Sequence, residues 1–360
     1  MANNAGKTRK LIKKYFLLCF IVIIEIFVSV FMLQADVSGY AYLDVPYYTQ
    51  SKGYYCGPAC LSMVFDYWGP FISQGEIADA ARTDGTYPNP YGTIPYEMRR
   101  AGHFSDMSTS AGESADHVTG YTGRGLGYAA YRTDFTLQQI KEALDAGCPV
   151  IVLMYAYDPD NAFNFGHFRV VIGYDDSANM ITLHDPYIGS FSLGQDAQLS
   201  YSDFEEYWEF AYSYNRAILT YPWDINMSLS AYPGGYKAGD ICTVYVNITY
   251  PSFLTSGIDD YTASSCQATL NIPAGVSLAP LETATKVITG EGSASGILAK
   301  GQSVHLEWDI IFNSPGVFNI TLEAEGQVSG SVSGHSSGVF TTSYSYTDRI
   351  GGTKSIDVTV

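Results

Sequence analysis

The pattern of apolar residues changes at Tyr221-Pro222, and this change constrains the fold more than any other feature of the chain. Before it, apolar residues at helical spacing alternate with strand-type runs. From Asp224 onward the chain is rich in Thr, Ser, Gly and Val, and turn residues separate its short alternating runs. We therefore expect an α+β domain over residues 40–222 and an all-β sandwich over residues 224–360.

Three runs in the second part alternate apolar and polar residues, at 242–248, 304–310 and 316–322. A period of two predicts strands that are buried on one face. Residues 271–276 and 314–316 resemble segments of Ig-like modules in secreted prokaryotic proteins, so we expect an Ig-like sandwich. Outside the cell, Cys242 and Cys266 would be its natural disulfide pair, which their spacing permits without requiring.

A helix is predicted to begin at Pro58, a residue type that suits a first helical turn. Gly69-Pro70 should end it. Its apolar residues recur at helical spacing: Leu61, Val64, Phe65 and Trp68.

Two further helices are expected to begin at capping boxes, Ser73-x-x-Glu76 and Thr136-x-x-Gln139, and Gly147 should end the second. Residues 150–157 are predicted to form a buried strand. Residues 84–130 are rich in Gly, Ser, Thr, Pro and Tyr, and we expect a long surface segment that shapes a substrate cleft. Its candidate contact residues are Tyr87, Tyr91, Tyr96 and Tyr128.

Cys56 lies just before the first predicted helix and six residues after Gln50. The positive end of the helix dipole favours a thiolate there, and the Gln50 amide can donate to an oxyanion that develops beside the sulfur. The alternative is a buried structural cysteine. A bridge to Cys60 is disfavoured, because four residues along a helix is awkward geometry for a disulfide.

A base for this thiol is predicted in a hairpin. Residues 166–174 and 180–186 form two strand-like runs around a polar turn at 175–179. Opposed residues of an antiparallel hairpin have a constant index sum, which places His167 within a residue or two of Asp185. Opposed side chains share a face roughly 5 Å apart, so the carboxylate can orient the imidazole toward the thiol.

Other histidines and cysteines are weaker candidates. His184 neighbours Asp185 and should point to the opposite face of its strand. His103 and His117 lie in polar, loop-like surroundings, and His305 and His335 lie in the distal half. Cys148 is expected to pack as a small apolar residue.

Gln50, Cys56, His167 and Asp185, in that order, resemble the active-site set of the papain-like cysteine peptidases, and in particular the C39-like branch. The resemblance covers about residues 40–220. It rests on segments 45–50, 56–63, 67–69, 147–152, 166–175, 185–186 and 201–208. It implies a papain-like domain with Cys56 as nucleophile, His167 as base, Asp185 as orienting acid and Gln50 as oxyanion donor.

The chain also departs from that family. The best-known members are fused to ABC exporters and cut after a double glycine, whereas this chain has neither a Walker A motif nor several membrane spans. The double-glycine substrate is therefore not expected here. Phe168 and Arg169 stand where small apolar residues are expected.

The N-terminal residues predict that the rest of the chain lies outside the cytoplasm. Basic residues mark positions 1–14, and residues 15–34 are apolar except for Glu25, Ser29 and Gln34. This run is long enough to span a bilayer with its basic flank in the cytoplasm. Whether it remains as a signal anchor, which we favour, or is cleaved as a signal peptide, for instance after Ala35 or Gly39, stays open.

Composition excludes some partners. The net charge of −17 argues against binding to nucleic acid or to anionic lipid. Glycosylation motifs at Asn226, Asn247 and Asn319 fit an extracellular location. No cofactor or metal is expected, because the acidic stretches 158–161 and 175–179 lack the full spacing of a calcium loop.

The predicted function is hydrolysis of peptide bonds in a peptide or protein substrate, through a Cys-His-Asp acyl-enzyme mechanism. Two alternatives stay open: an amidase or transpeptidase that acts on cell-wall or other amides, and a catalytically silent adhesion or binding protein with the same fold. The β-sandwich can recruit substrate, contact the cell surface or act as a spacer.

Overall fold

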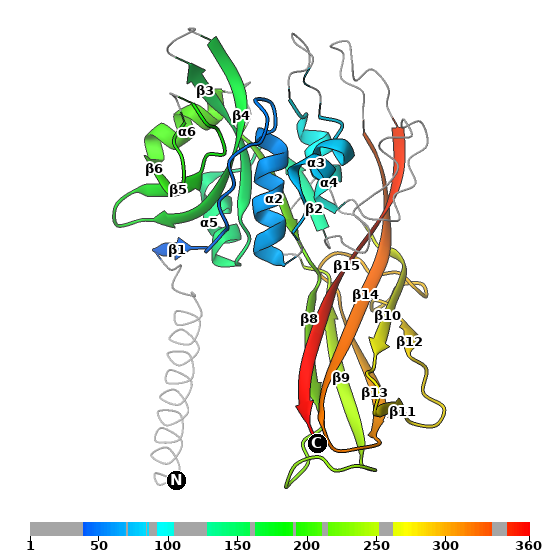
Figure 1. The fold of residues 1–360 in the computed structure, drawn as a ribbon. Helices are drawn as coiled ribbons and strands as arrows, with labels where there is room; N and C mark the ends of the chain where they lie inside the picture. Colours follow the sequence, from blue (N-terminus) through cyan, green and yellow to red (C-terminus); the bar gives the residue numbers. More distant parts are fainter. Residues whose placement is uncertain are drawn as a thin grey trace, which may run out of the picture. The chain divides into compact units, whose positions relative to one another are not determined.

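Among the residues that the computed structural model describes, helices and antiparallel strands build the part from 41 to 221, and strands with their connections build the part from 224 to 360 (Figure 1). The structure describes residues 39–69, 71–83, 85, 92–103, 128–158, 163–189, 192–210, 215–251, 262–332 and 344–360. The predicted membrane segment at 15–34 lies outside these residues. Among the described helices, none combines the length and the apolar character needed to cross a bilayer.

One sheet forms the centre of the first part. Its main path runs in the order β2-β7-β3-β4-β5-β6, each neighbouring pair antiparallel, and β1 (Tyr40–Tyr42) pairs with β4. The strands are β2 (Tyr128–Arg132), β3 (Val150–Asp158), β4 (Phe163–Asp175), β5 (Met180–His184), β6 (Ala197–Ser200) and β7 (Arg216–Tyr221). The predicted strand at 150–157 and the predicted hairpin are therefore confirmed as β3 and as β4–β5.

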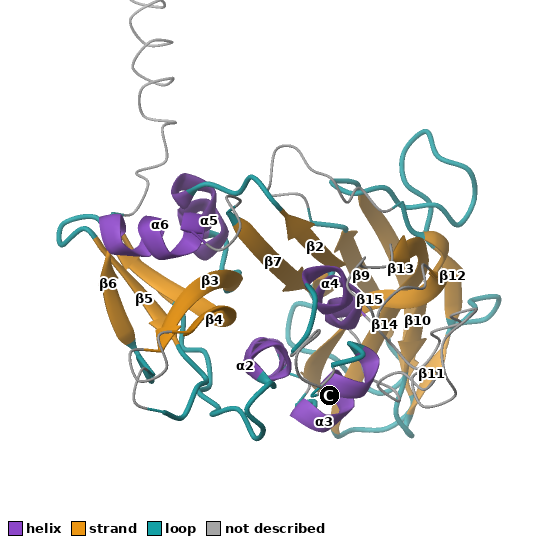
Figure 2. Ribbon diagram, turned by 90° about the horizontal axis from the view of Figure 1, so that it is seen from above, coloured by secondary structure: helices purple, strands orange, loops and turns teal. Residues whose placement is uncertain are grey.

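Helices cover both faces of this sheet. They are α2 (Cys56–Trp68), α3 (Gln74–Ala80), α4 (Pro95–His103), α5 (Leu137–Asp145) and α6 (Tyr201–Phe210). Successive residues of β3 point to opposite faces, so Val150 and Val152 join the core under α5 and α6, whereas Ile151 and Leu153 join the core under α2. Figure 2 shows α2 on one side of the sheet and α5 and α6 on the other.

The helix α2 begins at Cys56, two residues earlier than the predicted start at Pro58. Pro58 is the third residue of its first turn, where a backbone N–H would have no partner within the helix, so its missing donor costs no bond. Gly69 ends the helix as predicted. It adopts a φ of 124°, a conformation that favours glycine, and its N–H donates to Phe65 O at 3.0 Å.

Both predicted capping boxes are present. The side chain of Ser73 accepts from the Glu76 N–H at the start of α3, and that of Thr136 accepts from the Gln139 N–H at the start of α5. Gly147, with a φ of 77°, follows α5 as predicted and donates to Leu144 O at 2.9 Å.

The expectation of a long surface segment over residues 84–130 is wrong for its described parts, which contain the buried helix α4 and the strand β2. The polar residues of α4 suggest a surface position, but Arg100 and His103 are buried because they face the buried carboxylate of Asp348. Of the predicted contact tyrosines, Tyr96 is exposed at the surface and packs edge-on against Tyr131 at 4.9 Å. The other three side chains, those of Tyr87, Tyr91 and Tyr128, lie outside the described residues.

Two four-stranded sheets form residues 224–360, in the orders β12-β10-β14-β15 and β11-β13-β9-β8. Their strands are β8 (Asp224–Leu229), β9 (Ile241–Thr249), β10 (Ser264–Asn271), β11 (Val276–Leu278), β12 (Thr285–Val287), β13 (Ser303–Phe312), β14 (Val317–Val332) and β15 (Tyr344–Thr359). Alternate residues of both sheets, such as Val244 and Leu322, join one apolar core. The predicted all-β part is therefore confirmed, while its Ig-like kinship stays a prediction.

Cys242 and Cys266, whose bridging the sequence left open, are both free. Cys242 lies on β9 and Cys266 on β10, which belong to different sheets. The Cys242 sulfur is 3.6 Å from the Ser230 hydroxyl instead.

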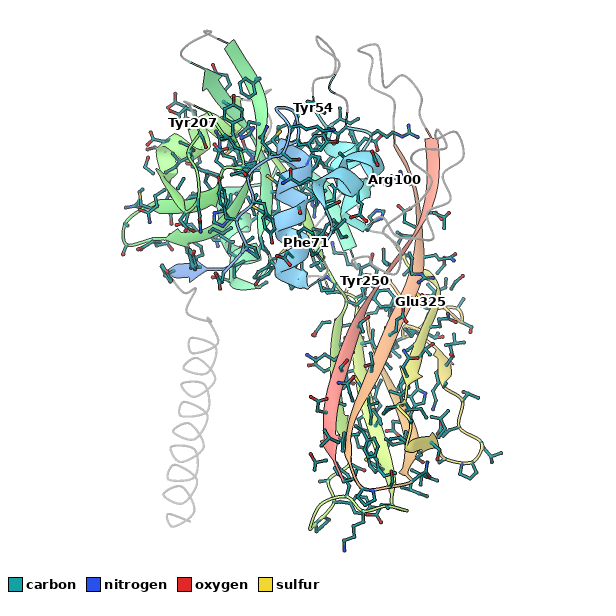
Figure 3. The ribbon with its side chains drawn as sticks, in the orientation of Figure 1. Tyr54, Phe71, Arg100, Tyr207, Tyr250 and Glu325 are labelled. Atoms are coloured by element: carbon teal, nitrogen blue, oxygen red, sulfur yellow. The ribbon has the colours of Figure 1, made fainter. Side chains whose placement is uncertain are left out.

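The two parts meet at a short junction. Only Pro222 and Trp223 separate β7 from β8, and Trp223 packs against Tyr250, which is labelled in Figure 3. The Asp348 carboxylate of β15 lies 3.7 Å from the Arg100 guanidinium and 3.1 Å from the His103 ring of α4, and all three side chains are fully buried. Residues 41–360 form one compact unit, and the domain boundary at 222–224 stays a prediction.

Candidate active site

Cys56 is the first residue of α2 and is partly exposed. The groups that act most strongly on its thiol are the side chain of His167 and the backbone of Phe168 and Gly57. Burial by itself would raise the pKa of the thiol. The hydrogen bond and charge of His167 outweigh this effect, so the pKa of Cys56 lies below its ordinary value.

The hairpin brings His167 to Asp185, as predicted from the sequence. The His167 Nε2 and Asp185 Oδ1 atoms are 2.7 Å apart, and both side chains are buried. This contact uses Nε2, so Nδ1 is the nitrogen left for the thiol. The register lies within the predicted range: Val170 pairs with His184, so Arg169 lies across from Asp185 and His167 is two residues away along β4.

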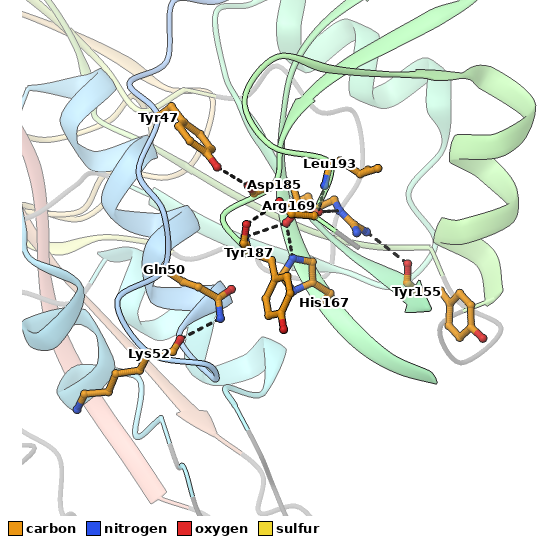
Figure 4. Close-up of polar contacts among 10 residues, drawn as sticks. Tyr47, Gln50, Lys52, Tyr155, His167, Arg169, Asp185, Tyr187 and Leu193 are labelled. Atoms are coloured by element: carbon orange, nitrogen blue, oxygen red, sulfur yellow. Dashed lines mark hydrogen bonds and ion pairs between the residues drawn. The ribbon is translucent and has the colours of Figure 1, made fainter. Parts of the chain in front are cut away.

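Four donors surround the Asp185 carboxylate (Figure 4). The His167 ring at 2.7 Å and the Tyr187 N–H at 2.9 Å meet Oδ1. The Arg169 Nε–H at 2.9 Å and the Leu193 N–H at 3.2 Å meet Oδ2. A buried carboxylate with this many donors is fixed in orientation and stays ionised.

These contacts set the charge state of the pair. Burial would lower the pKa of His167, but its hydrogen bonds with Asp185 and Cys56 raise it above the ordinary value. Burial would likewise raise the pKa of Asp185, yet its hydrogen bond with His167 and the charges of His167 and Arg169 hold it well below the usual range. A raised imidazole pKa and a lowered thiol pKa together favour a thiolate–imidazolium pair.

Gln50 lies next to this network. Its backbone N–H donates to Pro186 O at 2.7 Å, which places it against the residue that follows Asp185. Its side-chain Nε2 donates to Lys52 O at 2.9 Å, and the side chain is buried. An amide nitrogen has two hydrogens, so the bond to Lys52 leaves the second hydrogen of the Gln50 amide for another acceptor.

The rival residues have structural roles. The His184 Nε2–H donates to Val45 O at 2.9 Å, while its Nδ1 accepts from the Asp196 N–H, so both nitrogens are occupied on the other face of β5. Cys148 is buried in the core, as expected, and burial raises the pKa of its thiol. Burial also raises the pKa of Cys60, one helical turn beyond Cys56.

The structure also shows the surroundings of His103 and His305. His103 is not in a loop but is buried on α4 beside Asp348. His305 is exposed in the second part, where it contacts Asn247 and Glu307. Residues 117 and 335 lie outside the described residues.

The sequence did not identify three residues that touch the pair. Arg169 was recognised only as a departure from the expected small residues. The rings of Phe165 and Tyr187 lie edge-on to the His167 ring at 6.2 Å and 6.0 Å. The signal for Arg169 and Phe165 is that each stands two residues from His167 in a strand and therefore shares its face.

The acidic turn at 175–179 is held by its own side chains. Asp175 Oδ1 accepts from the backbone N–H and the hydroxyl of Ser177, and Asp176 pairs with Lys141. Within the described residues, no group of three or more acidic, His or Cys side chains is arranged to hold a metal.

Comparison with known proteins supports the sequence motifs. A model of the Peptidase_C39 like family matches residues 42–215. Among solved structures, the peptidase domain of Streptococcus ComA, a bi-functional ABC transporter involved in a quorum sensing pathway, is similar at 20% identity over 48% of this chain and 96% of that chain, with a TM-score of 0.30. A comparison with curated proteins found no match.

The matched residues contain Gln50, Cys56, His167 and Asp185. The family resemblance predicted from these residues is therefore confirmed: residues 42–215 match the model of the Peptidase_C39 like family.

Proposed function

We propose that this protein is a cysteine peptidase that hydrolyses peptide bonds through a Cys56 acyl-enzyme. The observation that carries the proposal is the buried His167–Asp185 contact at 2.7 Å, together with Cys56 at the start of α2, whose thiol pKa His167 lowers. A thiol whose pKa is lowered by an oriented imidazole is the arrangement that nucleophilic catalysis needs.

In the first step, Cys56 Sγ attacks the scissile carbonyl carbon and a C–S bond forms. The Gln50 amide donates to the oxyanion. The C–N bond then breaks as His167 transfers its proton to the leaving amine. In the second step, His167 takes a proton from water, and the hydroxide attacks the thioester. The C–S bond breaks, and the carboxylic acid leaves.

The test is incubation of the full-length protein with a peptide mixture and, separately, with purified cell-wall fragments, followed by mass spectrometry of the products and of the protein. We expect peptide cleavage that Cys56→Ala abolishes and that the control Cys242→Ala retains, since Cys242 lies in the second part of the chain. Cleavage of cell-wall amides alone would favour the amidase alternative. The absence of both cleavage and an acylated Cys56 would contradict the proposal and favour a silent binding protein.

We further propose that the protein acts outside the cytoplasm. The basic flank and apolar run at residues 1–34 support this location. The glycosylation motifs at Asn226, Asn247 and Asn319 lie on exposed strand positions, where a glycan can be accommodated. Protease protection in membrane vesicles tests the location, and whether the apolar run is retained is read from the N-terminal sequence of the mature protein.

A further inference from the structure

Arg169 is a buried cation beside the proposed catalytic pair. It stands two residues after His167 on β4, so both side chains share one face of the strand. Its Nε–H donates to Asp185 Oδ2 at 2.9 Å, while the His167 ring meets Oδ1 at 2.7 Å. The carboxylate is therefore held between two partners, one at each oxygen.

The guanidinium makes a second contact that fixes its own position. Its Nη1–H donates to the backbone oxygen of Tyr155 on β3 at 3.3 Å (Figure 4). Because the guanidinium is planar and its donors keep a fixed geometry, these two bonds together tie Asp185 to the backbone of the central sheet. A lysine ammonium has the same charge but cannot reproduce this planar pair of donors.

Arg169 also changes the charge that His167 experiences. Other titratable groups lie around this centre: Cys56 and Cys60 of α2, Asp185 and Tyr187 after β5, and Tyr47 before α2. Burial lowers the pKa of His167, whereas Asp185 and Cys56 raise it. Arg169, a fixed cation, opposes this rise. Arg169 therefore cancels part of the effect that the Asp185 charge has on the pKa of His167.

We propose that Arg169 is a positioning residue that holds Asp185 for His167 and offsets part of the carboxylate charge, so that His167 releases its proton more readily in each catalytic cycle. This role rests on the proposed function, because it concerns the same Cys56–His167 pair. In acylation His167 must give a proton to the leaving amine. Without the Arg169 cation, the Asp185 carboxylate would stabilise the imidazolium more strongly and make this proton transfer less favourable.

The test is the pH profile of Cys56 alkylation by iodoacetate in the full-length protein, read by mass spectrometry. This anionic reagent reacts with the thiolate and is attracted by the imidazolium, so the rate should rise as the thiolate forms and fall as His167 loses its proton. The midpoint of the falling limb reports the ionisation of His167, whatever the overall rate.

In Arg169→Met we expect the falling limb to move to higher pH, because His167 then faces Asp185 without the neighbouring cation. In Arg169→Lys the charge is kept, so the limb should stay near its wild-type position. The control Arg349→Met removes an arginine that pairs with Glu325 in the second part, and it should leave the profile unchanged. Thermal unfolding checks that each variant is folded.

If Arg169→Met does not fold, Arg169→Gln gives the same readout, since its amide can donate to Asp185 without a charge. A falling limb that keeps its wild-type position in a folded neutral variant would overturn the inference and leave Arg169 a purely structural residue. A wild-type protein that shows no alkylation of Cys56 below the range of an ordinary thiol would instead overturn the proposed function itself.

Discussion

Asp185 is the residue on which the candidate site depends most, because it meets His167, Arg169 and two backbone N–H groups at once. Its proximity to His167 could be predicted from the sequence, since the two ends of a hairpin are opposed whatever its exact register. Its contact with Arg169 could not be predicted. A register shift of two residues decides which side chain stands across from it, and the turn and its bulge set that register.

The depressed pKa of Asp185 predicts a pH dependence of stability. Between its native pKa and its unfolded value of about 4, the unfolded chain binds more protons than the native one. Its contribution to the free energy of unfolding is thus complete above about pH 4 and is lost as the pH falls. We expect urea unfolding between pH 2 and 5 to depend less steeply on pH in Asp185→Asn than in wild type.

The same substitution leaves the Arg169 cation buried beside a neutral amide, so at neutral pH we expect a loss of about 3 kcal/mol in the free energy of unfolding. The control is Asp357→Asn at an exposed position. It should change little in either the free energy of unfolding or its dependence on pH. If the free energy of unfolding varied with pH in the same way in wild type and Asp185→Asn, the fold would not lower the pKa of Asp185, and the prediction would be contradicted.

Among the elements, α2 and α4 position the nucleophile. The start of α2 carries Cys56, and α4 packs against the next residue, Gly57. The caps and ends of α2, α3 and α5 were predictable because they depend on neighbouring residues. The helix α4 was not, because its burial depends on Asp348 in the last strand, and no local pattern reports a partner so far along the chain.

A side chain at Gly57 should disturb this contact. A Cβ atom there would lie 2.7 Å from Met98 Sδ and 3.3 Å from the Phe168 ring, closer than normal packing allows. We expect Gly57→Ala to cost about 1–3 kcal/mol of stability through overpacking and to lower the alkylation rate of Cys56. Urea unfolding and the labelling rate measure the two effects.

The matched control is Gly75→Ala in α3, where the nearest side-chain atom would lie 3.9 Å away and the change should be neutral or stabilising. The double variant Gly57→Ala with Met98→Ala should cost less than the sum of the two single changes, since the shorter side chain at position 98 makes room. Strict additivity would contradict the proposed contact between α2 and α4.

For the whole molecule, the change of residue pattern at 221–222 correctly predicted an α+β part followed by an all-β part. Cys242 and Cys266 are both free, an outcome that their spacing in the sequence left open. The sequence also gave no sign that the two parts share buried charges. These features depend on contacts between distant segments, which spacing and composition do not encode.

Because Asp348 of β15 faces Arg100 and His103 of α4, we predict that this contact stabilises the folded chain. Asp348→Asn removes the charge that faces Arg100 and His103, all fully buried, so we expect the free energy of unfolding to fall by about 3 kcal/mol. Chemical unfolding of the full-length protein measures this loss, and the exposed Asp357→Asn on the same strand is the control. Equal stability of the two variants would contradict a supporting role for this contact.

The most direct measurement is the rate at which neutral iodoacetamide labels Cys56 at pH 6, compared between wild type and His167→Ala. We predict fast labelling in wild type, because His167 lowers the pKa of the Cys56 thiol, so that more of it is thiolate than in an ordinary thiol, whose pKa is about 8.5. His167→Ala should slow it markedly. Labelling of wild-type Cys56 only above about pH 8, or a rate that His167→Ala does not change, would contradict the thiolate–imidazolium pair and with it the proposed peptidase.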